Sequence, residues 1–190
     1  MSGKLLGSPI FWIVVINILG FTVSFLLESF PRIQKRFFKI PRILQQVFVL
    51  FVSGPPCILP FLPQPHFKSL GSIAIPIGII FIIMAAIFEI LAFREIWFIP
   101  SLVPKEKKGK VLDTGIYGLI RHPIYSGVIF LSLGLGLVFR AVYALVYLLI
   151  AAVFFGLITL IEEKDLIRDY GEEYNEYRKK IRWRLIPFLF

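Results

Sequence analysis

The stretch IYSGVIFLSLGLGLVFRAVYALVYLLIAAVFFGLITLI, residues 124–161, decides the fold of this chain. A helix needs about 20 mostly apolar residues to cross the roughly 30 Å hydrocarbon core of a bilayer, and this stretch is nearly twice that long. Its one charged residue, Arg140, lies near the middle. The pattern therefore predicts two membrane helices joined by a tight turn at Arg140, with both outer ends of the hairpin at the same membrane surface.

The whole chain has the composition of an all-α integral membrane protein. Of its 190 residues, 57% are hydrophobic and 17% are charged, and the mean hydropathy is +0.82. Soluble domains average about 45–50% apolar and about 25% charged residues. Three apolar stretches precede the hairpin, so we expect five transmembrane helices. These stretches are Ile10–Leu27, Ile43–Leu62 and Gly71–Phe93.

Basic residues give the expected orientation, because positively charged loops stay in the cytoplasm. All but three of the 21 lysines and arginines lie in residues 32–42, in residues 94–121 or after Ile161. Five alternating spans place these three segments on one side and put the N-terminus outside. The net charge of +9 is then explained by topology and by attraction to anionic headgroups, and no nucleic-acid partner is expected.

We expect a single membrane domain over residues 1–190. Three N-terminal spans occupy residues 1–93, and the second half, residues 94–190, holds the hairpin 124–161 and a cytoplasmic tail, residues 162–190. In this tail, apolar and aromatic residues recur at near-helical spacing, which predicts an amphipathic helix lying on the membrane or on the protein. These residues are Leu166, Tyr170, Tyr174 and Ile181. Cys57 is the only cysteine, so we expect no disulfide and no thiolate metal site.

A polar group of residues, GIYGLIRHPIYSG at 115–127, stands directly before the hairpin. Pro123 suits the first turn of a helix, which places His122 at the helix N-terminus. Folding of the hairpin brings this group to Glu162 and Glu163, and a carboxylate there is costly unless it is paired or faces a polar cavity. The residues alone leave two interpretations open: a binding site, or an interfacial belt of tyrosine and arginine followed by an ordinary surface helix.

Together with EEKDLIRDYGEEYNEYRKKIRWRLIPF, which follows one hairpin later, GIYGLIRHPIYSG resembles the isoprenylcysteine carboxyl methyltransferase family. The family is meant here in its wider sense, with its bacterial and archaeal homologues and the related phospholipid methyltransferases. The resemblance covers roughly residues 109–188. It implies a helical membrane bundle that binds S-adenosyl-L-methionine in a pocket facing the cytoplasm. The cofactor-binding residues that it implies are Gly109, Lys110, Val111, Leu112, Tyr117, His122, Pro123, Ile124, Tyr125 and Glu162.

Two positions depart from the family pattern. Gly109 stands where the family usually has histidine, so a contact there would come from the backbone. Members that act on prenylated cysteine carry an arginine one helical turn before the first glutamate, where this chain has Ile158. We therefore expect Ile158 to line the pocket for the methyl acceptor. The resemblance assigns no catalytic residue, no metal and no oligomeric state.

The resemblance implies an S-adenosylmethionine-dependent membrane methyltransferase acting on a membrane-embedded or lipid-linked acceptor, such as an isoprenylcysteine carboxylate. Phospholipid N-methylation is the nearest alternative. A second is an NADPH-dependent membrane sterol reductase, although those enzymes prefer asparagine at the position of Ile124 and lack the Glu162–Glu163 pair. A non-catalytic membrane scaffold is the third.

Overall fold

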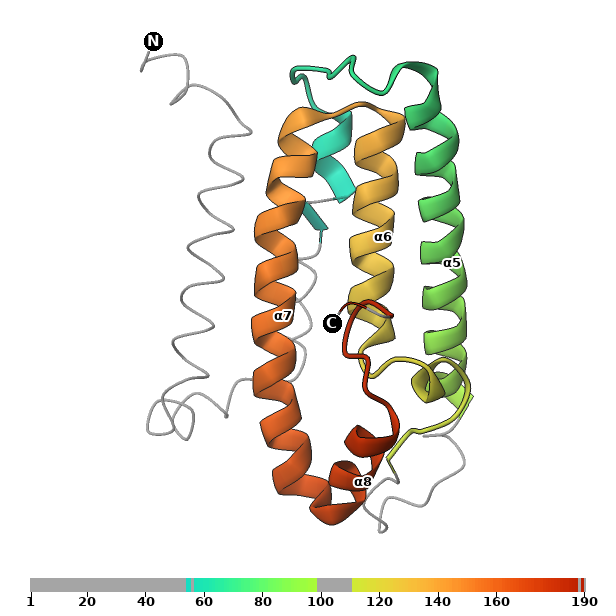
Figure 1. The fold of residues 1–190 in the computed structure, drawn as a ribbon, viewed down its shortest axis with the longest axis vertical. Coiled ribbons are helices and arrows are strands. Elements are labelled where there is room, and N and C mark those ends of the chain that lie inside the picture. Colours follow the sequence, from blue (N-terminus) through green and yellow to red (C-terminus); the bar gives the residue numbers. More distant parts are fainter. Residues whose placement is uncertain (1–53, 56, 99–110, 188, 190) are drawn as a thin grey trace, which may run out of the picture.

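The computed structural model describes residues 54–55, 57–98, 111–187 and 189. Over these residues the chain is helical, without strands apart from one isolated bridge between His66 and Ala141. Three long helices, α5, α6 and α7, run side by side, and the short helix α8 lies at one end of them (Figure 1). In chain order the elements are η1 (Leu59–Phe61), η2 (Gly71–Ile73), α5 (Ala74–Phe98), η3 (Gly115–Gly118), α6 (Pro123–Val138), α7 (Val142–Tyr170) and α8 (Glu172–Lys180).

Helices α5 and α6 pack closely because glycines meet where they cross. A Cβ atom added to Gly78 would lie 2.7 Å from the carbonyl oxygen of Gly134, and a Cβ added to Gly134 would lie 2.7 Å from that of Gly78. Small residues at the interface allow the backbones of two membrane helices to approach each other this closely. The contact fixes α6, whose N-terminus carries the polar group predicted above.

The predicted tight turn between the two hairpin helices is confirmed. Helix α6 ends at Val138, α7 begins at Val142, and Arg140 between them takes a positive φ of 52°. No side chain of the turn caps α7. Instead Gln64, from the segment before α5, accepts hydrogen bonds from the backbone N–H groups of Tyr143 (2.9 Å) and Ala144 (3.2 Å).

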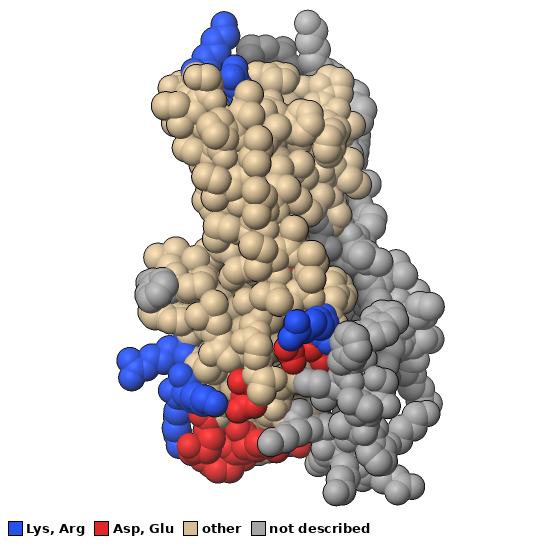
Figure 2. Space-filling view, turned by 90° about the vertical axis from the view of Figure 1, so that its right-hand side faces the viewer, with Lys and Arg blue, Asp and Glu red and all other residues tan. Residues whose placement is uncertain are grey.

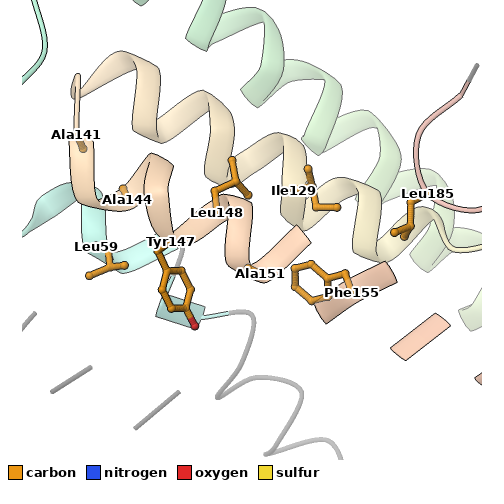
Figure 3. Packing of buried hydrophobic residues seen from close by; sticks show 9 residues of the cluster. All are labelled: Leu59, Ile129, Ala141, Ala144, Tyr147, Leu148, Ala151, Phe155 and Leu185. Atoms are coloured by element: carbon orange, nitrogen blue, oxygen red, sulfur yellow. The ribbon is translucent and has the colours of Figure 1, made fainter. Parts of the chain in front are cut away.

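The hydrophobic core runs along the interface between α6 and α7 (Figure 3). Its buried side chains include Ile129 of α6 and Phe155 of α7. Two segments that are distant in the sequence reach the same core: Leu59 comes from η1, and Leu185 comes from the chain after α8. The C-terminal segment is therefore part of the folded core.

Charge and hydropathy agree with a membrane-spanning arrangement. The segments Gly71–Glu95 and Val142–Tyr170 are each long and apolar enough to cross a bilayer, whereas α6 has 16 residues and is shorter than the usual 20 or so. Figure 2 shows a broad band of the surface without charged side chains between two charged ends. Helix α5 also exposes large apolar side chains such as Ile80 and Ile90.

Five spans remain a prediction. The first expected span, Ile10–Leu27, and most of the second, Ile43–Leu62, lie outside the described residues. The described end of the second expected span forms the 3-10 helix η1 at Leu59–Phe61. This short helix contains Pro60, and proline disrupts a regular α-helix.

The tail differs from the single amphipathic helix that its spacing predicts. Helix α7 continues beyond its apolar part to Tyr170, and Gly171, with φ 59° and ψ −127°, separates it from α8. Glycine takes such a conformation without the steric cost that a Cβ atom brings. The aromatic face packs on the protein, because Tyr174, Tyr177 and Ile181 are buried in one cluster against Val111.

Candidate functional site

The site begins at the N-terminus of α6. His122 is the N-cap residue and Pro123 occupies the first turn, as the sequence predicts. The imidazole of His122 is buried, with 7% of the side chain exposed. The preceding loop is held by α8, where Glu173 accepts a hydrogen bond of 3.0 Å from the N–H of Val111 and the Tyr177 hydroxyl donates one of 2.8 Å to the carbonyl oxygen of Tyr117.

The segment after α8 returns along the start of α6 (Figure 1). The backbone N–H of Arg121 donates to the carbonyl oxygen of Trp183, and that of His122 donates to the carbonyl oxygen of Arg184, both at 3.0 Å. The hydroxyl of Ser126 donates to the carbonyl oxygen of Leu185. The first two bonds occupy backbone N–H groups at the start of α6 that would otherwise lack partners, and the third joins the α6 side chain of Ser126 to the C-terminal segment.

Glu162 faces the same site from α7. Its Oε1 atom accepts a hydrogen bond of 2.5 Å from the Tyr125 hydroxyl, and its Oε2 atom lies 3.4 Å from Nδ1 of His122. The side chain is 42% exposed. The carboxylate is therefore fixed by two ring systems and still accessible from outside.

Glu163, one residue further, has a different environment, with only 4% of its side chain exposed. Arg184 holds both of its oxygens, with nitrogen–oxygen distances of 3.0 and 2.9 Å. Nε of Arg121 lies 3.2 Å from Oε1, Nε2 of His122 lies 3.4 Å from it, and Nε of Arg178 lies 3.7 Å from Oε2. Glu163 thus joins the loop, α8 and the C-terminal segment at one buried carboxylate.

The electrostatics of the two neighbouring loop residues differ. Burial disfavours a charge on His122, but the hydrogen bonds and negative charges of Glu162 and Glu163 outweigh it, so the pKa of His122 is raised above its ordinary value. Burial, together with the positive charges of Arg184 and Arg178, lowers the pKa of Arg121 although Glu163 opposes this effect. The surroundings thus favour the protonated form of His122 more than water does, whereas they favour the charged form of Arg121 less than water does.

Two cavities meet at these residues. The smaller, of about 260 Å³, lies at the start of α6. The larger, of about 440 Å³, lies between the loop, the end of α7 and α8. Both are lined by Tyr117, Arg121, His122 and Glu162. The smaller adds Pro123, Ile124 and Tyr125, and the larger adds Val111, Leu112, Asp165, Leu166, Asp169, Tyr170, Tyr174 and Tyr177.

The structure brings together the described residues of the expected cofactor pocket. Each lines at least one of the two cavities: Val111, Leu112, Tyr117, His122, Pro123, Ile124, Tyr125 and Glu162. Gly109 and Lys110 lie outside the described residues. Ile158 packs, partly buried, against the core between α6 and α7, and it is not among the residues that line either cavity. Its contact with an acceptor stays a prediction.

Several site residues were not identified from the sequence. Arg121 lines both cavities, but the family resemblance points to its neighbour His122 and not to Arg121. Arg184 was missed because it stands 21 positions after Glu163 and only the return of the chain brings the two together. Asp165 and Asp169 follow Glu162 at near-helical spacing, and this periodicity was the one available signal for a common acidic face.

Parts of this sequence match known proteins. The family described as phospholipid methyltransferase matches residues 73–173. Among curated proteins, the chain is 35% identical over 79 residues to protein-S-isoprenylcysteine O-methyltransferase of Schizosaccharomyces pombe, covering 40% of this chain and 34% of the relative. It is 30% identical over 113 residues to methanethiol S-methyltransferase of Pseudomonas deceptionensis, covering 57% of this chain and 42% of the relative.

A reductase also matches. The chain is 32% identical over 102 residues to Delta(14)-sterol reductase of Methylotuvimicrobium alcaliphilum, covering 51% of this chain and 23% of the relative. In each of the three relatives the match covers less than half of the relative's length.

Proposed function

Because the chain belongs to the phospholipid methyltransferase family, we propose that it is an integral membrane enzyme that methylates a membrane-embedded or lipid-linked acceptor with S-adenosylmethionine. The observation that carries the proposal is the pair of cavities that meet at His122 and Glu162. A methyl transfer needs a place for the donor and a place for the acceptor with one shared boundary, and this site offers both.

The larger cavity has the chemical groups that S-adenosylmethionine requires. Tyrosine rings in its wall offer flat apolar surfaces to an adenine ring, and the carboxylates of Glu162, Asp165 and Asp169 accept hydrogen bonds from ribose hydroxyls or an ammonium group. Its volume of about 440 Å³ lies within the roughly 300–1,000 Å³ typical of small-molecule sites. The residues present therefore fit the cofactor.

When bound, the sulfonium of the cofactor supplies an electrophilic methyl group. The work of the protein is to align the acceptor with it and to exclude water, which is where most of the rate enhancement of such a transfer arises. Glu162 is held in place by Tyr125 and His122, so it needs no rearrangement to face a cationic ligand. Tyr117, shared by both cavities, forms part of the boundary.

The smaller cavity is the proposed acceptor site, so Pro123, Ile124 and Tyr125, which the family resemblance assigns to the cofactor, are proposed to border the acceptor as well. Its wall includes Pro123, Ile124 and Tyr125 in the first turn of α6, next to the apolar part of the bundle, so a lipid-linked group reaches it from the membrane side. A carboxylate acceptor, such as that of an isoprenylcysteine, needs no base. An amine acceptor, as in phospholipid N-methylation, must lose a proton, and His122 and Glu162 both line the smaller cavity where a base could take it.

The proposed enzyme has its N-terminus outside the membrane and its site facing the cytoplasm, where S-adenosylmethionine is available. The concentration of basic residues in segments 32–42 and 94–121 and after Ile161 supports this orientation.

A membrane reductase is the second candidate, because a sterol reductase is among the relatives. Thermal unfolding in detergent distinguishes the two functions, since a ligand at 100 times its Kd adds about 2.7 kcal/mol to the stability. A methyltransferase is stabilised by S-adenosylhomocysteine and not by NADPH, and the reverse result would overturn the proposal.

The acceptor is found by incubating membrane lipid extracts with the protein and methyl-labelled S-adenosylmethionine, followed by mass spectrometry. The variant Ile158→Arg tests a separate prediction, that the acceptor extends beyond the smaller cavity to Ile158. In that case the change alters which lipids are labelled and leaves S-adenosylhomocysteine affinity unchanged. A loss of cofactor binding by the folded variant would contradict this placement.

A further inference from the structure

The buried charges around Glu163 do not balance. Three guanidinium groups, those of Arg121, Arg178 and Arg184, lie within 4 Å of this one carboxylate. Arg184 takes both of its oxygens in a two-pronged hydrogen bond. The nearby Glu162 is directed to Tyr125 and His122 instead. Among the described residues, the cluster therefore has more positive than negative charge.

Arg121 is the most buried of these cations. The Nε atoms of Arg121 and Arg178 are both buried donors without a hydrogen-bond acceptor among the described residues, but the Arg121 side chain is only 7% exposed, whereas that of Arg178 is 36% exposed. Although Nε lies 3.2 Å from Oε1 of Glu163, the N–H group is not aligned with that oxygen. A buried charge normally has a hydrogen-bonding partner, because removing it from water is costly.

Arg121 also borders space that a ligand can occupy. Arg121 is one of the four residues that line both cavities. Burial and the neighbouring positive charges lower the pKa of Arg121, and the negative charge of a bound anion offsets both effects. A guanidinium matches a carboxylate well, since it offers parallel N–H groups to two oxygens.

We propose that Arg121 is the carboxylate-binding residue of this site, and that the carboxylate completes the charge balance around Glu163. Resting on the proposed function, the carboxylate comes from the amino-acid end of S-adenosylmethionine or from the acceptor. Glu162, Asp165 and Asp169 in the same wall then face the ammonium and hydroxyl groups of the cofactor, and Arg121 supplies the matching positive charge. If the acceptor is a carboxylic acid, Arg121 also binds the acceptor carboxylate, the role of the arginine that prenylcysteine-specific members carry at the position of Ile158.

The experiment measures ligand binding by calorimetry to the full chain in detergent. The cofactor probes are S-adenosylhomocysteine and 5′-methylthioadenosine, which lacks the amino-acid carboxylate. The acceptor probes are N-acetyl-S-farnesylcysteine and its methyl ester. The variants are Arg121→Met, Arg121→Lys and, as a matched control, Arg182→Met, because Arg182 is exposed in the same C-terminal segment as Arg184.

If the cofactor supplies the carboxylate, Arg121→Met lowers the affinity for S-adenosylhomocysteine by about tenfold to a hundredfold and leaves that for 5′-methylthioadenosine nearly unchanged. If the acceptor supplies it, Arg121→Met removes the preference for the free acid over its methyl ester and leaves S-adenosylhomocysteine binding intact. Arg121→Lys keeps the positive charge, so its effect in either case is smaller than that of Arg121→Met. Arg182→Met changes neither affinity.

Unchanged discrimination by a folded Arg121→Met protein overturns the inference. If that variant does not fold, the unsubstituted protein still decides: equal affinity with and without a carboxylate in both probe pairs overturns it. Failure of the unsubstituted protein to bind S-adenosylhomocysteine or 5′-methylthioadenosine overturns the proposed function instead, and the acceptor pair then tests Arg121 separately.

Discussion

The Tyr125 hydroxyl, in the first turn of α6, donates a hydrogen bond of 2.5 Å to Oε1 of Glu162 near the end of α7. The two residues stand 37 positions apart and meet because the hairpin returns to its starting level. The Tyr125 ring stacks with the rings of His122 and Phe155, at centroid distances of 6.0 and 5.4 Å. Glu162 is thus held by Tyr125, which is itself packed against Phe155 of the core.

We therefore expect Glu162→Gln to weaken S-adenosylhomocysteine binding by about tenfold to a hundredfold, as expected when a charge-assisted hydrogen bond is lost. Glutamine keeps the shape of the side chain and can still accept from Tyr125, so the protein remains folded. Calorimetry in detergent measures the change. An affinity equal to that of the unsubstituted protein would return the two glutamates to the role of an ordinary helix segment.

Glu163→Gln should act on stability instead. The side chain is buried against three arginines, and removing one partner from a buried ion pair typically costs about 3–5 kcal/mol. We expect a clear drop in the unfolding temperature without ligand and a smaller effect on cofactor affinity than Glu162→Gln has. The prediction is wrong if Glu163→Gln unfolds at the same temperature as the unsubstituted protein.

His122 should make stability depend on pH. Its pKa is raised in the folded protein by Glu162 and Glu163, against the effect of burial. The protonated form therefore stabilises the fold fully below the unfolded pKa of about 6.5, and this contribution is lost as the pH rises through the folded pKa. The unfolding temperature of the unsubstituted protein should fall over that range relative to that of His122→Gln. His66→Gln is the control, since His66 is exposed and is the only other histidine.

The C-terminal segment should be required for a stable fold. Leu185 is 3% exposed and belongs to the core between α6 and α7, and truncating such a residue to alanine usually costs about 2–5 kcal/mol. Leu189, only four residues later, is 76% exposed, so Leu189→Ala is a matched control. Thermal unfolding of both variants checks the prediction, and equal stability would show that the segment does not hold the start of α6.

The proposed orientation is tested with single cysteines in a Cys57→Ser background. Lys68 and Lys164 are both exposed. Lys68 precedes the candidate span Gly71–Glu95 and Lys164 lies in the last part of Val142–Tyr170, so the five-span prediction places them on opposite sides of the membrane. An impermeant maleimide applied to intact cells should label Lys68→Cys at once and Lys164→Cys only after permeabilisation. The opposite pattern would place the site on the outer side of the membrane.

Much of the site was predictable from local sequence. The hairpin and its turn follow from an apolar stretch twice the length of one span, and the N-cap position of His122 follows from Pro123. Because the two ends of a hairpin meet, the contact between the Arg121–Tyr125 stretch and Glu162 could also be anticipated. The break at Gly171 was missed, since the helical spacing of Tyr170 and Tyr174 continues across it.

The sequence by itself determined the membrane character of the chain and the hairpin, because hydrophobic length and helical periodicity are local properties. The family resemblance, and not these local properties, indicated eight of the residues that line the cavities. Only the tertiary structure decided how the two glutamates differ. Glu162 and Glu163 are adjacent in sequence, but successive helix residues point about 100° apart, and the returning C-terminal segment brings Arg184 to the side that Glu163 faces. One carboxylate is thereby neutralised in the interior, and the other is left open to a ligand.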